Sequence, residues 1–136
     1  MNTSRRLIFS LASSPEFFRV VGSAHDWAEA VPKSAKVLTF ERMAVNDDEL
    51  EALVGYLDVR CIDLDATRVT DRSIAMIASL PKLEELWLEE TEVTDAGLVA
   101  LHSATKLKFL SVAYSRVTPI GVMALRAALS RLSVSE

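Results

Sequence analysis

Apolar residues recur along this chain with a period of 24 residues, beginning near residue 35. Three copies of the pattern are complete, over residues 59–82, 83–106 and 107–130, and a weaker copy covers 35–58. Five apolar columns run through all four copies, which indicates a protein built from repeated structural units. In the copy at residues 83–106, the residues of these columns are Leu86, Leu88, Val93, Leu98 and Leu101.

Within each copy the spacing of apolar residues changes from that of a strand to that of a helix. Leu86 and Leu88 flank Trp87, and such alternation predicts a short β-strand. Leu98 and Leu101 follow at helical spacing. Each unit is therefore predicted to be one strand followed by one helix, and a residue should occupy the same place as the residue one period later.

A helix-start signal lies between the predicted strand and the predicted helix in every copy. Thr70 and Thr94 each precede an aspartate, which predicts an N-cap and an acidic first turn that the helix dipole favours. Pro119 stands at a first helical position, where its missing N–H costs no hydrogen bond. Asn46 and Glu49 have the spacing of a capping box, in which each side chain bonds the backbone of the other residue.

The spacing L-x-x-L-x-L, followed by V-T-D-x-G-L-x-x-L, resembles the leucine-rich repeat over about residues 35–134. The V-T-D-x-G-L segment is similar to short bacterial repeats and to the cysteine-containing repeats of F-box proteins. The resemblance implies an α/β fold, a right-handed leucine-rich-repeat solenoid with a parallel sheet on one face and helices on the other. Thr67, Thr91 and Ser115 lie where many such repeats have asparagine, and their hydroxyls are expected to bond the buried backbone of the turn.

The ends of such a stack need covers, because the terminal units otherwise expose apolar faces. We expect residues 1–34 to form an N-terminal helical cap, with one helix beginning at Ser14 and a second, short helix around Trp27. The repeats then fill residues 35–136 and close with a terminal strand over 131–135. The apolar residues expected to pack the cap against the core are Phe17, Phe18, Val20, Val21 and Trp27.

Composition and charge narrow the classes of function. Half of the 136 residues are apolar and a quarter are charged, as in one globular domain, and no apolar run approaches the length of a membrane span. Residues 1–36 carry a net charge of +2 and residues 37–136 carry −6, so the acidic body argues against nucleic-acid binding. Cys61 is the only cysteine and there is no clear signal peptide, which favours a reducing, cytoplasmic location.

The residue types that catalysis requires are not found at catalytic spacings. No serine or cysteine has a histidine and an acid at a recognisable spacing, and the two histidines and Cys61 lie in different predicted elements. None of the four glycines belongs to a phosphate-binding loop. We therefore expect no enzymatic activity, no cofactor and no metal site.

The outward positions of the predicted strands carry most of the candidate binding residues. Glu41, Asp65 and Glu89 form a column of like charges about 5 Å apart between repeats, whereas charges elsewhere alternate in sign. A solvated acidic surface and a site for a basic peptide or protein both explain this column, and a divalent cation is a third reading. The acidic residues assigned to the predicted site are Asp63, Asp65, Glu85 and Glu89.

Large aromatic residues favour the binding site over the solvated surface. Trp87 takes the central outward position of the central strand, Phe109 lies one strand away, and Tyr114 follows that strand. Exposed aromatic rings bordered by carboxylates are typical of a binding hot spot. We therefore predict a non-catalytic scaffold that binds a protein or peptide of basic character on the concave strand face, with the Trp87 ring open to solvent. Trp87→Ala should then weaken the partner by about 2 kcal/mol while folding stays nearly intact. Flat packing of Trp87 on Phe109 is the alternative.

Two other functions fit the same pattern. A structural subunit of a larger assembly would bury the strand face or the open edge of the terminal strand, where a dimer would also form. The cysteine-containing repeat type implies a substrate-recruiting module of a ubiquitin-ligase-like complex, which requires an F-box. Residues 6–31 show only a faint likeness to an F-box.

Overall fold

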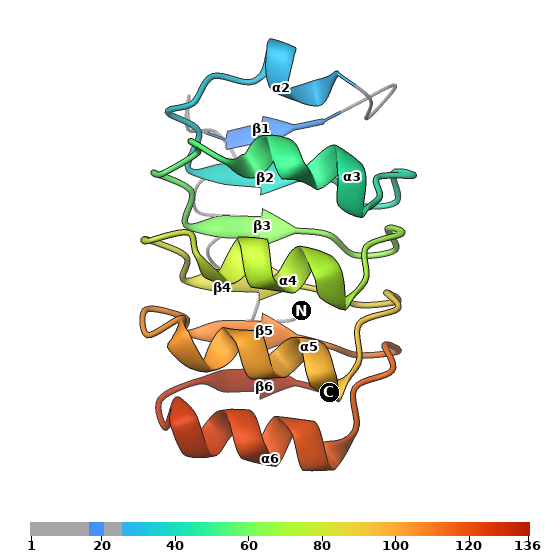
Figure 1. Ribbon diagram of the computed structural model, residues 1–136, viewed down its shortest axis with the longest axis vertical. Coiled ribbons are helices and arrows are strands. Elements are labelled where there is room, and N and C mark those ends of the chain that lie inside the picture. Colours follow the sequence, from blue (N-terminus) through green and yellow to red (C-terminus); the bar gives the residue numbers. More distant parts are fainter. Residues whose placement is uncertain (1–16, 21–25) are drawn as a thin grey trace.

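The computed structural model describes residues 17–20 and 26–136, in which six parallel strands form one sheet. The strands follow one another across the sheet in chain order, so each strand pairs with the next (Figure 1). Neighbouring strands of a parallel sheet need a crossover between them, and helices supply it in this chain. The strands are β1 Phe17–Arg19, β2 Val37–Thr39, β3 Cys61–Asp63, β4 Glu85–Trp87, β5 Phe109–Ser111 and β6 Ser133–Ser135.

One helix follows each of the strands β1 to β5, and these helices lie on the same side of the sheet (Figure 1). The result is a repeating strand–helix arrangement of α/β class, compatible with a repeat solenoid. Short 3₁₀ segments, Glu51–Leu53 and Leu101–Ser103, extend two of the helices. The helices are α2 Trp27–Ala30, α3 Asp47–Leu50, α4 Asp71–Ala78, α5 Asp95–Ala100 and α6 Pro119–Ala128.

The strand pairing confirms the predicted register of the repeat. Ile62 pairs with Leu38 on one side and with Leu86 on the other. Leu110 pairs in turn with Leu86 and with Val134, so one apolar column runs from β2 to β6. The four side chains from β2 to β5 belong to the main core between the sheet and the helices, and the partly buried Val134 packs against that core. Burying one such side chain fully stabilises the fold by about 1.5–3 kcal/mol.

The first strand corrects the prediction that the cap consists of two helices. Phe17 and Phe18 are not helical, because they lie in β1, which pairs with β2. The physical reason is the edge of β2, whose backbone N–H and C=O groups can be satisfied by a parallel strand but not by a helix. Phe18 packs against the main core, and Phe17 packs against a cluster on the opposite face of the sheet. The predicted helix start at Ser14, like Val21, lies outside the described residues.

The second predicted helix is present as α2, and Trp27 closes the N-terminal end of the core as expected. The Trp27 ring centroid lies 5.1 Å from that of Phe40 and 5.0 Å from that of Tyr56. Its indole N–H donates a hydrogen bond of 2.9 Å to the carbonyl oxygen of Glu49. The Tyr56 hydroxyl donates to the carbonyl oxygen of Val31 at 2.6 Å, which ties the segment after α2 to the first repeat.

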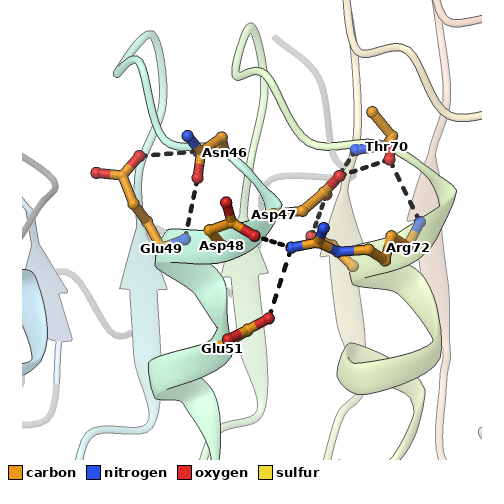
Figure 2. Close-up of polar contacts among 8 residues, drawn as sticks. Asn46, Asp47, Asp48, Glu49, Glu51, Thr70 and Arg72 are labelled. Atoms are coloured by element: carbon orange, nitrogen blue, oxygen red, sulfur yellow. Dashed lines mark hydrogen bonds and ion pairs between the residues drawn. The ribbon is translucent and has the colours of Figure 1, made fainter.

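The predicted helix starts are confirmed. Asn46 and Glu49 form the capping box, with bonds of 3.0 and 3.1 Å between each side chain and the backbone N–H of the other residue (Figure 2). The hydroxyl oxygens of Thr70 and Thr94 accept the backbone N–H two residues later. Pro119 begins α6.

An aspartate in the first turn of the helix links each of three units to the next one. Asp47 accepts hydrogen bonds from the backbone N–H and the hydroxyl of Thr70, at 2.9 and 2.6 Å (Figure 2). Asp71 and Asp95 form the same pair of bonds with the threonines that precede α5 and α6. Because a carboxylate acceptor strengthens a hydrogen bond, these bridges join successive units through polar contacts as well as through the core.

Hydroxyl groups hold the turn after three of the strands, as predicted. Thr67, Thr91 and Ser115 donate to the carbonyl oxygen three residues earlier, at 2.7, 2.8 and 2.6 Å. The residue before each of them adopts a left-handed φ between 56° and 59°. The same backbone turn recurs in the first copy at Arg42, with a φ of 63°, although Met43 has no hydroxyl to hold it.

The aspartate bridges make the stability of the fold depend on pH. Partial burial acts to raise the pKa of Asp47, but hydrogen bonds from Ser73 and Thr70 outweigh it and lower that pKa below its ordinary value of 3.8. Hydrogen bonds from Thr118 likewise lower the pKa of Asp95. Because both folded-state pKa values are depressed, the stabilisation is present above the unfolded-state value and is lost as pH falls through the folded-state values.

A double variant, Asp47→Asn with Asp95→Asn, should therefore flatten the acid side of the stability profile. We expect the midpoint of thermal unfolding to fall less steeply in the variant than in the wild type between about pH 5 and about pH 3. Circular dichroism melts at matched ionic strength measure this difference. An equally steep fall in both proteins would show that these two carboxylates do not carry the acid sensitivity.

Candidate functional site

The side of the sheet away from the helices, called the strand face below, carries a second apolar cluster. Val37, Cys61, Trp87 and Phe109 form this cluster, and Phe17 packs against it. The ring centroids of Trp87 and Phe109 lie 4.9 Å apart, with an angle of 49° between the ring planes. The cluster comes from outward positions of adjacent strands, as the repeat register predicted.

The prediction that Trp87 is open to solvent is wrong, because the exposed fraction of this residue is 0%. Phe109 is also buried, and so are Asp63, Asp65 and Glu85, whose exposed fractions are 2, 5 and 5%. The register of a strand decides toward which side a side chain points, but what lies over that side is a tertiary property. The alternative interpretation, packing of Trp87 on Phe109, describes the contact that the structure shows.

Glu85 is a buried carboxylate held by two donors of the apolar cluster. The indole N–H of Trp87 donates to Glu85 Oε2 at 2.8 Å, and the thiol of Cys61 donates to the same oxygen at 3.3 Å. Burial raises the pKa of the Cys61 thiol well above its usual range, and the negative charge of Glu85 adds to the rise. The thiol is therefore protonated near neutral pH and serves as a hydrogen-bond donor rather than as a nucleophile.

The other carboxylates of the predicted site are those of Asp63, Asp65 and Glu89, called the carboxylate row below. Each of them accepts a hydrogen bond from a neighbouring strand or turn. Asp63 Oδ1 accepts the backbone N–H of Asp65 at 3.0 Å, and Asp65 Oδ1 accepts the backbone N–H of Glu89 at 2.8 Å. Glu89 Oε2 accepts the hydroxyl of Ser111 at 2.5 Å. Charge-assisted bonds of this kind are roughly twice as strong as neutral ones, and they offset the repulsion between stacked like charges.

Glu41 joins Asp63 and Asp65 at one end of this row. One oxygen atom of each side chain lies within 4.8 Å of the others, and oxygen atoms are the ligands that Mg²⁺ and Ca²⁺ prefer. Arg19 lies beside the group, with its Nη1 atom 4.0 Å from Glu41 Oε1. The hydrogen bond from the backbone N–H of Asp65 fixes the orientation of one of these carboxylates, that of Asp63.

One residue of the predicted site stands apart from the rest. Tyr114 has an exposed fraction of 85% and lies in the left-handed turn after β5, with a φ of 59°. The structure adds Val37, Cys61 and Ser111 to the strand face. The repeat columns place all three at outward positions, but their small side chains gave no reason to single them out.

The charges immediately before β3, β4 and β5 alternate in sign, in contrast to the strand face. Glu84 Oε2 accepts a hydrogen bond from Arg60 Nε at 2.6 Å, and Glu84 Oε1 lies 3.0 Å from Lys108 Nζ. The hydrogen bond from Arg60 lowers the pKa of Glu84, and Lys108 adds to the effect against partial burial. Across the outward columns from β2 to β5, by contrast, the chain places acidic, apolar and small side chains and neither lysine nor arginine.

Comparison with known proteins identifies no relative, so the function is argued from the geometry of the strand face. No protein-family model matches the chain, and no curated protein sequence matches it. Among the residues that the structure describes, no helix combines the length and the apolar character needed to cross a membrane. The segment with a faint likeness to an F-box lies partly outside the described residues, and its described part holds β1 and α2.

Proposed function

We propose that this chain is a leucine-rich-repeat solenoid and a non-catalytic protein-binding scaffold, with the strand face as its binding surface. The segment that it binds carries basic and apolar side chains. The observation that carries this proposal is an apolar cluster beside a row of carboxylates on one face of the sheet. Trp87 and Phe109, which are both buried, form the apolar cluster, and Asp63, Asp65 and the half-buried Glu89 supply the charge.

The chemistry of the strand face favours such a segment. Guanidinium and ammonium groups form strong, charge-assisted hydrogen bonds with carboxylates. Asp65 and Glu85 are already fixed by hydrogen bonds, so binding does not have to order them. Because a desolvated carboxylate is costly without donors or an opposite charge, a basic side chain stabilises a complex more at this face than at an exposed surface.

The repeat geometry supports the assignment to leucine-rich repeats. The register runs from β2 to β6 without a shift. Hydroxyls of Thr67, Thr91 and Ser115 bond the turn at the position where the resembled repeats have asparagine. Stacked units of this kind present outward side chains about 4.8 Å apart, which suits a polypeptide segment lying across the strands.

The titratable groups support binding rather than catalysis. The Cys61 thiol is buried and bonded to Glu85, so it is not available as a thiolate. His102 is exposed in the 3₁₀ segment after α5, on the helix side of the sheet and away from the carboxylate row. His25 lies outside the described residues.

A double variant, Asp65→Asn with Glu89→Gln, should weaken the binding of a basic peptide by about tenfold or more. Both amides keep the size of the carboxylates but remove their charge, so the expected loss is electrostatic. The probe is a fluorescein-labelled peptide with two adjacent arginines followed by an apolar run, and fluorescence anisotropy measures its dissociation constant. Added NaCl should weaken binding to the wild-type chain for the same reason.

The matched control is Asp48→Asn with Glu92→Gln, which removes two exposed charges that pair with Arg72 and Arg116. This control should leave the dissociation constant unchanged. A peptide with glutamates in place of its arginines should not bind. If the wild-type chain binds both peptides equally well, the proposed function is refuted.

A second function, as a subunit of a larger assembly, is favoured by the C-terminal end of the chain. Ile120 and Met123 of α6 have exposed fractions of 77 and 69%, and β6 is an edge strand of the sheet. In α4 and α3, the positions equivalent to Ile120 hold Arg72 and Asp48, which form an ion pair (Figure 2). An oligomer of the isolated chain that is stable in light scattering would favour this function. Recruitment of substrates for ubiquitin ligation stays a prediction.

A further inference from the structure

We propose that two molecules of this chain form a reversible dimer through the outward face of α6, with the two α6 helices antiparallel. The inference deepens the second function and rests on it, because it names another molecule of this chain as the partner in the assembly. Six exposed apolar residues on α5 and α6, called the α6 patch below, form the contact. They are Ala96, Val99, Ile120, Met123, Ala124 and Ala127.

The helix α6 is apolar on two opposite faces. Its inner face packs in the main core, to which Val122 and Leu125 belong. Four outward residues follow one another at i, i+3, i+4 and i+7, the spacing of a single helix face: Ile120, Met123, Ala124 and Ala127. Ile120 and Met123 are 77 and 69% exposed. Because a helix with apolar residues all round is normally buried, this outward face is suited to contact with another helix.

The earlier helices show that the fold does not require apolar residues at these positions. The positions equivalent to Ile120 and Met123 are charged in α3, where Asp48 and Glu51 pair with Arg72 of α4 (Figure 2). In α5 both positions hold apolar residues of the α6 patch. The outward side of the helices therefore changes from charged at α3 to apolar at α5 and α6.

The sizes of the side chains favour antiparallel pairing of α6 with an identical helix. The large Ile120 and Met123 lie in the first half of α6, and the small Ala124 and Ala127 lie in the second half. In an antiparallel pair, Ile120 of one molecule faces Ala127 of the other, and Met123 faces Ala124. Large side chains then pack on small ones, which lets the two helices approach closely. Parallel pairing would instead place isoleucine on isoleucine and leave a gap between the alanines.

The charges of α6 permit contact between two identical faces. Arg126 is the only charged residue of α6, and no residue of the α6 patch carries a charge. Pairing of identical patches therefore buries no like charges. Antiparallel pairing also places the C-terminal end of each helix beside the N-terminal end of the other, so the helix dipoles attract each other.

The edge strand β6 is less suited to contact with a second molecule. The backbone groups of Ser133 and Ser135 bond to β5, so those of Val134 between them point away from the sheet's last pair of strands. Arg126 Nη2 donates to the carbonyl oxygen of Val134 at 3.3 Å. A short edge strand with a charged side chain over it is protected against pairing with another strand. The helix face is therefore the better contact.

The size of the α6 patch sets the expected strength of the dimer. A standard interface buries roughly 800 Å² per molecule, and a patch of three large side chains and three alanines is smaller. We therefore expect a dissociation constant on the order of 10 μM or weaker. The strand face lies on the side of the sheet away from α6 (Figure 1), so the dimer leaves both strand faces free to bind.

Sedimentation velocity of the full-length chain tests the dimer. Between about 2 and about 500 μM, the wild-type chain should change from monomer to dimer. Ile120→Arg with Met123→Glu should raise the dissociation constant by about tenfold or more. These substitutions introduce the residue types that α4 and α3 carry at the equivalent positions, Arg72 and Glu51, and they leave the net charge unchanged.

The matched control is Val54→Arg with Tyr114→Glu. Val54 and Tyr114 are 75 and 85% exposed, lie outside the α6 patch, and receive the same two charges. The control should dimerise like the wild type, and circular dichroism melts at about 2 μM should give similar unfolding midpoints for all three proteins. A wild-type chain that stays monomeric, or an Ile120→Arg, Met123→Glu variant that dimerises like the wild type, overturns the inference.

Exchanging the sizes of two side chains tests the antiparallel arrangement. Ala127→Ile places an isoleucine opposite Ile120 of the second molecule, so it should weaken the dimer by about tenfold although it adds apolar surface. Addition of Ile120→Ala to this variant should restore the dimer, because a large residue again faces a small one. A dimer that Ala127→Ile strengthens would overturn the antiparallel arrangement, since non-specific association increases with apolar surface.

Peptide binding separates this inference from the two functions proposed above. At concentrations at which it is monomeric, the Ile120→Arg, Met123→Glu variant should bind the fluorescein-labelled basic peptide like the wild type. A wild-type monomer with charge-dependent peptide binding would overturn the dimer and leave the strand-face function intact. A dimer without peptide binding would support the α6 patch and refute the strand-face function. An oligomer that both α6 substitutions leave unchanged would favour assembly through another surface and overturn the α6 contact.

Discussion

Trp87→Ala is expected to lower the free energy of unfolding by about 3–5 kcal/mol, the range for truncating a buried tryptophan. The ring is 0% exposed and packs on Phe109, so its removal leaves a cavity in the strand-face cluster. The variant also removes the N–H that bonds Glu85, which leaves a buried carboxylate with one donor fewer. This expectation reverses the one drawn from the sequence, in which Trp87 was a solvent-exposed anchor and folding stayed nearly intact.

Urea unfolding followed by circular dichroism measures the effect, and Tyr114→Ala is the control. Tyr114 is 85% exposed, so its truncation should change the free energy of unfolding by no more than about 0.5 kcal/mol. Trp87→Phe should recover part of the loss, since it keeps an aromatic ring but not the bond to Glu85. An unfolding midpoint of Trp87→Ala equal to that of the wild type would contradict the burial of this ring.

Gly97→Ala is expected to destabilise the fold by about 2–3 kcal/mol, although alanine is intrinsically the better helix former. A Cβ atom at residue 97 would collide with Asp71 Oδ1 and would lie 3.2 Å from Val93 Cγ1. Asp71 relieves the collision only by turning away from Thr94, whose N–H and hydroxyl it accepts at 2.7 and 2.6 Å. The cost is therefore the loss of the bridge between two units.

A double-mutant cycle tests this explanation. In an Asp71→Ala background the obstacle is gone, so Gly97→Ala should be neutral or stabilising by up to about 1 kcal/mol. Gly121→Ala should repeat the destabilisation one unit later, where a Cβ would collide with Asp95. Additive effects of Asp71→Ala and Gly97→Ala would show that the aspartate is not the reason for glycine at this position.

The repeated part of the fold was predictable because its signals are local. Alternation at Leu86 and Leu88 and helical spacing at Leu98 and Leu101 repeat in every unit, so the register followed from aligning the copies. The segment before the repeats carried no such period. Phe17–Arg19 was misread as helical because its strand conformation depends on pairing with β2, which is a contact across about 20 residues of sequence.

The candidate site was predictable in its membership but not in its environment. The columns of outward residues brought Asp63, Glu85, Trp87 and Phe109 together, and the structure places them together. Their burial, and the bonds of Trp87 and Cys61 to one oxygen of Glu85, depend on side-chain packing that periodicity does not encode. Tyr114 is the opposite case. It follows β5 closely in the sequence, yet it is exposed and does not join the cluster.

The sequence by itself determined the repeat, its register, the helix starts and the side of the sheet toward which each strand residue points. These properties follow from backbone geometry, in which strands alternate every residue and helices turn every 3.6 residues. Only the tertiary structure decided that β1 extends the sheet, that Asp71 approaches Gly97 from the preceding unit, and that the strand face is buried. Each of these depends on which side chains and segments meet in space, and the spacing of apolar residues along the chain does not specify those contacts.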